Sequence, residues 1–203
     1  MERKGILFVI SGPSGAGKGT VLRRVLEQET GLAVSVSATT RAPRAGEIDG
    51  IHYHFKTQEE FDRMIENHEF LEYVAKFHNK YGTPKAQVLK MLDEGTDVIL
   101  EIETIGAAKV RKEFPKAVLV FVTPSSYSEL EKRLDRRGTE EEAVKAMRLK
   151  IAKTEYKSMK YYNYIAINDD LDRCVDTVSA IIRAERVNLK RNPETVEYFR
   201  HID

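Results

Sequence analysis

Glycines close to the N-terminus have the types of neighbours and the spacing needed to bind a phosphate chain. They belong to the segment Gly12-Pro13-Ser14-Gly15-Ala16-Gly17-Lys18-Gly19-Thr20, which lies between a short apolar run and a helical pattern. Glycine lets the backbone turn so that successive N–H groups point at an anion, and the next helix contributes its positive end. Lys18 adds a full charge near the outer phosphates. We expect a strand, a phosphate loop and a helix that bind a nucleoside triphosphate, rather than a turn with a solvated lysine.

Position 19 departs from the commonest form of this loop. It is glycine, where a serine or threonine hydroxyl usually contacts Mg²⁺. We therefore expect the Mg²⁺ that accompanies ATP to find a ligand elsewhere or to keep more of its water, and we assign it no certain protein ligand.

A second segment could hold a phosphate monoester. Arg41 and Arg44 are three apart in a turn-rich stretch, with Ser37 before them and Tyr53 after them. Guanidinium groups bind phosphate bidentately, and hydroxyl groups can take the remaining oxygens. An exposed, solvated loop is the alternative, because short stretches of this composition are common.

The elements that must position these residues follow an alternating pattern. Short apolar runs at 6–10, 98–102, 118–122 and 164–167 predict buried strands, and helical patterns separate them. This alternation is typical of βαβ units, so we expect an α/β fold with a parallel sheet flanked by helices. A short helix is expected near 58–68 and a final helix over about 171–190.

Two segments interrupt the alternation. Residues 33–82 are strand-like and turn-rich, and residues 133–157 are highly charged. The remaining ranges, 1–32, 83–132 and 158–190, would form the core, with 191–203 as a peripheral tail. The insertions could be surface decoration. They could also form a second-substrate subdomain and a closing lid, since phosphoryl transfer must be shielded from water.

The bulk composition excludes several classes of protein. The 203 residues carry 33 basic and 32 acidic side chains, a balance that argues against a nucleic-acid or membrane binder. The single cysteine, Cys174, excludes an internal disulfide and fits a reducing compartment. No apolar run reaches membrane-spanning length. We expect a cytoplasmic protein whose partners are small molecules, and the oligomeric state stays open.

With these residues in view, the chain resembles the guanylate kinase family over roughly residues 4–190. The matching motifs are, in chain order, Gly12-Pro13-Ser14-Gly15-Ala16-Gly17-Lys18, Ser37-x-Thr39-Thr40-Arg41-x-Pro43-Arg44-x-Gly46-Glu47, Phe70-Leu71-Glu72-Tyr73, Tyr81-Gly82-Thr83-Pro84, Leu100-Glu101-Ile102-Glu103-x-x-Gly106, Arg137-Gly138-Thr139 and Ile167-Asn168-Asp169-Asp170. The resemblance implies a P-loop core with an inserted GMP-binding subdomain at 33–82 and a helical lid at 133–157. It implies the reaction ATP + GMP ⇌ ADP + GDP in purine nucleotide metabolism, extending to dGMP, with Mg²⁺ bound to ATP.

The resemblance also implies roles for individual residues. ATP would be bound by the loop and by later polar residues, namely Gly12, Pro13, Ser14, Gly15, Ala16, Gly17, Lys18, Gly19, Thr20, Arg133, Arg137 and Asn168. GMP would be bound by residues of the first insertion and of the strand at 98–102, namely Ser37, Arg41, Arg44, Tyr53, Glu72, Tyr81, Thr83, Glu101 and Glu103. Catalysis would rest on the cations Lys18, Arg41, Arg137 and Arg148.

The chemistry of guanine agrees with a carboxylate in its site. Guanine presents N1–H and N2–H donors that one carboxylate can accept together, whereas adenine would leave that carboxylate unpaired. Glu101 and Glu103 are two apart in an expected strand, so they would share one face at its carboxyl end, where open parallel sheets bind ligands. A solvated strand end is the alternative for this pair, and a surface position is the alternative for Glu72. Thr83 could instead, or in addition, cap a helix.

The roles of the arginines in 133–157 and of Glu103 stay open. Arg133, Arg137 and Arg148 have many acidic neighbours in sequence and could be solvated helix charges. The family most often has aspartate where this chain has Glu103 and glutamine where it has Ile105, which puts direct contact of Glu103 with Mg²⁺ or the base in question.

Three rival functions can be compared with this interpretation. A kinase for another nucleoside monophosphate would have no use for carboxylates facing the base. A kinase-like interaction module would not need Lys18, Arg137 or Arg148. A regulatory GTPase would need an aspartate after the Asn79-Lys80 pair, which continues here as Tyr81-Gly82.

Overall fold

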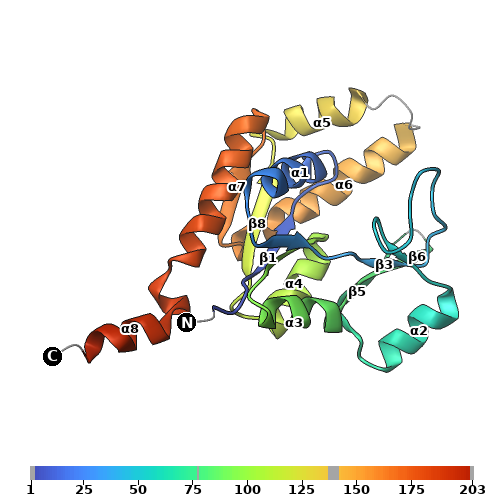
Figure 1. Ribbon diagram of the computed structural model, residues 1–203. Coiled ribbons are helices and arrows are strands. Elements are labelled where there is room, and N and C mark those ends of the chain that lie inside the picture. Colours follow the sequence, from blue (N-terminus) through green and yellow to red (C-terminus); the bar gives the residue numbers. More distant parts are fainter. Residues whose placement is uncertain (1–2, 77, 137–141, 202–203) are drawn as a thin grey trace.

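The computed structural model describes residues 3–76, 78–136 and 142–201 (Figure 1). Its larger sheet has five strands in the order β2 (Leu32–Val34), β7 (Asp97–Glu101), β1 (Leu7–Ser11), β8 (Val118–Thr123) and β9 (Tyr164–Ile167). All of its pairings are parallel. The expected parallel sheet is confirmed, and its four anticipated strands are β1, β7, β8 and β9. The three-residue strand β2 is an addition.

Helices cover both faces of this sheet. Helices α1 (Lys18–Gln28) and α7 (Leu171–Arg186) pack on one face, and α3 (Lys85–Asp93) and α4 (Thr104–Glu113) pack on the other. Alternate residues of a strand point to opposite faces. In and beside β1, Ile6, Phe8 and Ile10 therefore pack in the apolar cluster on the face covered by α1 and α7. Leu7 and Val9 pack in the cluster on the opposite face, which α3 and α4 cover. The sheet is therefore buried on both sides, which holds its carboxyl edge rigid.

A second, smaller sheet lies to one side of the first (Figure 1). Its strand order is β4 (His54–Phe55), β3 (Ala38–Thr39), β6 (Asn79–Pro84) and β5 (Phe70–Lys76). This sheet ends at Pro84, two residues beyond the expected insertion 33–82, and β2 at the start of that range belongs to the larger sheet. The strands of the small sheet thus fall between 38 and 84, and the role of 33–82 as a GMP-binding subdomain stays a prediction.

Helix α2 (Gln58–Glu66) covers part of the small sheet and has a complete capping box. The Thr57 hydroxyl accepts from the Glu60 backbone N–H at 3.1 Å, and the Glu60 carboxylate accepts from the Thr57 N–H at 2.8 Å. Each side chain satisfies an N–H that the helix leaves unpaired, so the helix begins sharply at residue 58. Phe61 stacks on Phe70 of β5, with ring centroids 4.4 Å apart.

The described parts of the charged segment 133–157 are helical. Helix α5 (Tyr127–Arg136) ends within it, and α6 (Glu142–Ser158) occupies most of it. Leu130 and Leu134 of α5 pack on Ala152 of α6 in a small apolar cluster of their own. A single 3₁₀ turn, η1 (Met159–Tyr161), then leads into β9.

Helix α7 ends at Arg186, four residues before the expected end. A 3₁₀ turn, η2 (Leu189–Arg191), and helix α8 (Pro193–Arg200) follow, and α8 extends away from the body of the molecule (Figure 1). Arg191 ties this end to the fold through Glu185, at 2.5 Å, and the Lys116 carbonyl, at 3.0 Å. None of the helices in the described ranges has the length and hydropathy required to cross a bilayer.

Candidate active site

The phosphate loop joins β1 to α1 at the carboxyl edge of the large sheet. Gly12 has φ +143°, and a Cβ there would lie 2.0 Å from the Val122 carbonyl oxygen. Gly17, the N-cap of α1, has φ +85°, and a Cβ there would lie 2.5 Å from Asn168 Nδ2. Both positions combine a left-handed backbone with close contacts, so only glycine fits. These contacts hold the loop against the ends of β8 and β9.

Asn168 supports the loop from behind. It is buried directly after β9, and its Nδ2 donates to the Ala16 carbonyl at 2.7 Å. Asn168 therefore lies against the phosphate loop, and its place in the ATP site stays a prediction. The residue next to it, Asp169, is 4.0 Å from Arg133, whose Nε also donates to Glu129 at 3.0 Å. Arg133 is therefore held beside the loop by two carboxylates.

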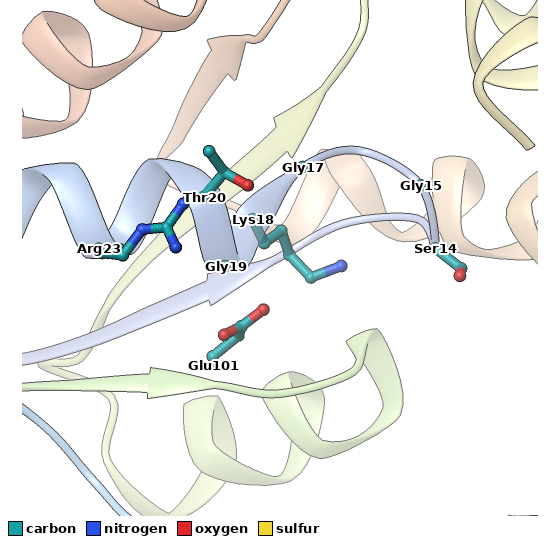
Figure 2. Close-up of a pocket in the computed structure, with 8 residues that line it drawn as sticks. All are labelled: Ser14, Gly15, Gly17, Lys18, Gly19, Thr20, Arg23 and Glu101. Carbon is teal, nitrogen blue, oxygen red and sulfur yellow. The ribbon is translucent and has the colours of Figure 1, made fainter. Parts of the chain in front are cut away.

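Lys18 lies at the first position of α1. Its Nζ donates to the Gly12 and Pro13 carbonyls, at 2.7 and 3.1 Å, and so closes the loop on itself. Beside it is a hollow of about 370 Å³, into which Lys18 and Glu101 project from opposite sides (Figure 2). The hollow is lined by Ser14, Gly15, Gly17, Lys18, Gly19, Thr20, Arg23 and Glu101.

The charges around this hollow are mixed. Loss of solvent lowers the pKa of Lys18, and the negative charges of Glu101, Glu155 and Glu103 oppose that shift. Loss of solvent raises the pKa of Glu101, and Lys18 opposes it. Among the described residues, the Lys18 ammonium is thus balanced by carboxylates through space and forms no direct ion pair, while its short hydrogen bonds go to the two loop carbonyls.

Glu101 and Glu103 do not share a strand face, contrary to the expectation. Glu101 is the last residue of β7 and faces the phosphate hollow, where its oxygens would lie 3.8 Å from a Cβ at Gly19. Glu103 lies beyond the strand as the N-cap of α4 and forms an ion pair with Lys76 of β5. The strand ends one residue earlier than the apolar pattern predicts, so the two carboxylates point to different partners.

The arginines of the first insertion are held by an unexpected glutamate. Arg41 Nη2 donates to both Glu47 oxygens at 2.8 and 2.9 Å, and the Arg44 backbone N–H donates to Glu47 at 2.7 Å. The hydrogen bond from Arg41 lowers the pKa of Glu47. Glu47 belongs to the matched motif, but the sequence indicated no role for it.

Two tyrosines lie next to Arg41. The Arg41 guanidinium is 5.4 Å from the centre of the Tyr53 ring, and Tyr53 and Tyr81 make an edge-on contact with ring centroids 6.2 Å apart. Ser37 immediately precedes β3, and its carbonyl accepts from the His54 N–H at 2.9 Å. The fold therefore brings Arg41, Tyr53 and Tyr81 together, with the exposed Arg44 at the rim of the group.

Glu72 and Thr83 form a buried polar pair on the small sheet. They are cross-strand partners in β5 and β6, and the Thr83 hydroxyl donates to Glu72 Oε1 at 2.9 Å. Burial raises the pKa of Glu72, and the hydrogen bond from Thr83 opposes that shift. Thr83 does not cap a helix, because Pro84 is the N-cap of α3. The other Glu72 oxygen would lie 2.4 Å from a Cβ at Gly106 of α4, so this carboxylate fills the space that a side chain there would need.

One of the three arginines expected in the lid approaches the loop directly. Arg148 of α6 donates from Nη1 to the Ser14 hydroxyl at 3.3 Å. Arg137 lies outside the described residues. In the described ranges, no group of three or more histidine, cysteine or carboxylate side chains is arranged to hold a metal ion.

A phosphate loop at the carboxyl edge of a parallel sheet, with a second sheet that presents cations and a buried carboxylate, defines a P-loop nucleotide-binding protein. Residues 4–185 match the family model described as guanylate kinase. The chain is 50% identical to the guanylate kinase of Caldanaerobacter subterraneus subsp. tengcongensis over 96% of its own length and 94% of the relative's. It is 47% identical to that of Halalkalibacterium halodurans, covering 94% and 93%.

A solved structure agrees with these relatives. The guanylate kinase of Anaplasma phagocytophilum superposes with a TM-score of 0.77 at 33% identity, covering 94% of this chain and 90% of that one. This chain belongs to the guanylate kinase family. The resemblance on which the sequence interpretation rests is confirmed.

Proposed function

We propose that the site described above performs the reaction of this guanylate kinase, the transfer of the terminal phosphoryl group of ATP to GMP, which gives ADP and GDP. Membership of the family carries the activity itself. The observation that carries the assignment of the site is the buried Glu72–Thr83 pair, a preformed carboxylate acceptor on the small sheet that is separate from the residues lining the phosphate hollow.

The GMP phosphate is assigned to the cluster around Arg41. A phosphate monoester takes hydrogen bonds from guanidinium and phenol groups, and Arg41, Tyr53 and Tyr81 already lie together. Arg44 and Ser37 complete this set. Arg41 must exchange Glu47 for the phosphate, so Glu47 serves to hold the guanidinium ready and to neutralise it between turnovers.

The base is assigned to Glu72 and Thr83. With Oε1 bonded to Thr83, the Glu72 carboxylate keeps acceptor capacity for N1–H and N2–H of guanine. Glu103, bound to Lys76, lies on the same side of the site and contributes charge there. Glu101 is assigned to the phosphate side and not to the base, since it lines the hollow with Lys18.

The donor nucleotide is assigned to the phosphate loop, and it enters as its Mg²⁺ complex. Lys18 exchanges its two carbonyl acceptors for phosphate oxygens. Arg133 of α5, Arg148 of α6 and Arg137, which lies between them in the sequence, are assigned to the same phosphates. Because Gly19 offers no hydroxyl, a bound Mg²⁺ would either take a protein ligand elsewhere or keep more of its water than in the commonest form of this loop.

Catalysis then consists of positioning and charge neutralisation. The acceptor oxygen of GMP is already ionised, so no general base is needed. Lys18, Arg41, Arg137 and Arg148 stabilise the negative charge that spreads over the transferred group. The small sheet with 133–157 closes over the reactants and excludes water. A cytoplasmic location, where ATP and GMP are available, follows from this activity.

A coupled assay of ADP release tests the assignment. ATP and Mg²⁺ are held fixed while GMP, dGMP, AMP, CMP and UMP are supplied in turn. We expect turnover with GMP and dGMP and a preference for GMP over AMP of roughly 10⁴–10⁵, since a buried acceptor left unpaired is costly. Comparable rates with GMP and AMP would exclude Glu72 as the group that reads the base.

A further inference from the structure

Helix α6 lies against the phosphate loop along one face. Arg148, Ala152 and Glu155 are spaced by four and three residues, so they share that face. Arg148 donates to the loop hydroxyl of Ser14, and Ala152 is buried. Next to Glu155, the Tyr156 hydroxyl bonds Thr123 Oγ1 at the end of β8, at 2.8 Å. The helix is thus fixed to the sheet at the level of Glu155.

Glu155 is a buried carboxylate that the mechanism above does not use. Only 8% of it is exposed, and it interacts electrostatically with Lys18, Glu103 and Lys76. The hydroxyls of Tyr156 and Tyr162 also lie in its field. No donor in the described ranges forms a hydrogen bond to its carboxylate. Burial raises the pKa of Glu155, and the positive charges of Lys18 and Lys76 oppose that shift.

This arrangement is costly unless it serves Lys18. A buried charge without a close partner loses solvation, and well-packed neutral side chains usually replace it without loss of stability. Lys18 has the complementary difficulty, because the loop shields it from water and its direct acceptors are two uncharged carbonyls. Glu101 across the hollow is the first of the carboxylates that favour its charge, and Glu155 and Glu103 add to it. Two opposite charges shielded from water favour each other's ionised form.

We propose that Glu155 is a positioning residue that acts through Lys18: its carboxylate, fixed on α6, keeps the Lys18 ammonium charged and directed into the phosphate loop before ATP binds. The proposal rests on the function assigned to the loop. It gives α6 a second role, since one helix face carries both Arg148, assigned to the closing lid, and the carboxylate that prepares the loop.

The effect belongs to the unloaded enzyme. Once ATP is bound, its phosphates supply far more negative charge next to Lys18 than Glu155 does. The pH dependence of kcat/KM reports groups in the free enzyme, whereas that of kcat reports groups in the complex. Loss of the Glu155 charge should therefore alter the alkaline limb of kcat/KM for ATP and leave that of kcat in place.

Glu155→Gln tests the proposal, with Glu155→Asp as the conservative variant and Glu185→Gln as the matched control. Glu185 is equally buried, but its partners are Tyr164 and Arg191, which the reaction does not use. We expect the alkaline limb of kcat/KM for ATP to move about one pH unit lower in Glu155→Gln. At high pH this shift corresponds to a roughly tenfold lower kcat/KM for ATP than in the parent. Glu155→Asp should restore most of it, and Glu185→Gln should match the parent.

Equilibrium binding of a non-hydrolysable ATP analogue with Mg²⁺, without GMP, is the second measurement. The same alkaline shift should appear in its Kd, and this readout does not depend on which acceptor the enzyme uses. An unchanged limb in Glu155→Gln, or an equal shift in Glu185→Gln, would overturn the role of Glu155. A parent enzyme that binds the analogue at no pH would instead overturn the function assigned to the loop.

Discussion

The Thr83 hydroxyl donates to Glu72 at 2.9 Å across two antiparallel strands, and both side chains are buried. This pair is preorganised, since Thr83 occupies one carboxylate oxygen and fixes the direction of the other. A base that offers two donors can then bind without rearrangement of the protein.

Glu72→Gln should lower kcat/KM for GMP more than for AMP. The amide keeps the shape of the carboxylate but loses its charge, and its NH₂ can donate to adenine N1. The GMP/AMP ratio of kcat/KM, measured in both enzymes by ADP release, should therefore narrow by at least roughly tenfold. Glu69→Gln is the control, because Glu69 is exposed just before β5. An unchanged ratio in Glu72→Gln would move recognition of the base to Thr83 and Glu103.

Gly106→Ala should weaken GMP binding although alanine favours a helix. A Cβ at this position would lie 2.4 Å from Glu72 Oε2, so the carboxylate must move. We expect KM for GMP to rise about tenfold, with KM for ATP unchanged, because a displaced acceptor weakens its hydrogen bonds to the base. Ala108→Gly in the same helix is exposed and controls for helix propensity alone. A normal KM for GMP in the Gly106→Ala enzyme would show that the position of Glu72 is not critical.

Activity with GMP should fall on the acid side at a higher pH than an ordinary glutamate would give. Burial raises the pKa of Glu72, and the protonated acid can no longer accept both guanine donors. The ionised form is needed, so kcat/KM for GMP is full above the raised pKa and is lost as the pH falls through it. Measured from about pH 4 to 8, this acid limb should disappear in Glu72→Gln. Its persistence there would assign it to another group.

Lys18→Ala should abolish most of the turnover without unfolding the protein. Lys18 bonds to its own loop, so its removal leaves the apolar clusters intact. Loss of such a transition-state contact typically lowers kcat by about 10²–10³. Lys90→Ala, at an exposed position of α3, is the control. Circular dichroism and Tm should match the parent in both variants, and near-parent turnover in a folded Lys18→Ala enzyme would contradict the mechanism.

Asp97→Ala should destabilise the fold by about 3 kcal/mol. Asp97 is fully buried and accepts from the Ile6 N–H at 2.7 Å, from Arg3 at 2.8 Å and from Arg186 at 2.7 Å. Its loss leaves the buried Ile6 N–H and the Arg3 guanidinium without this acceptor, and Arg186 keeps its bonds to Glu29 and the Thr30 carbonyl. Asp93→Ala removes an exposed pair with Lys4 and should change the free energy of unfolding by less than about 0.5 kcal/mol. Urea denaturation compares them, and equal effects would contradict the prediction.

The parts of the fold that the sequence determines are those set by local pattern. The strands at β1, β7, β8 and β9 and the helix α2 follow from apolar runs and a capping box, which neighbouring residues decide. The phosphate loop is equally local, because the conformation of its glycines and the helix after it are properties of one continuous segment. The strand β2 does not follow from local pattern, since three residues are too few to recognise.

Only the tertiary structure decided which charges meet. Spacing placed Glu101 and Glu103 on one face of a strand, but β7 ends at Glu101, and the two side chains lie near Lys18 and Lys76 respectively. The sequence indicated no role for Glu47 or Glu155. A turn brings Arg41 to Glu47, and the packing of α6 brings Glu155 near Lys18. A carboxylate looks the same in a sequence whether it is solvated or buried. Its neighbours in space, which long-range packing selects, determine its charge state and its function.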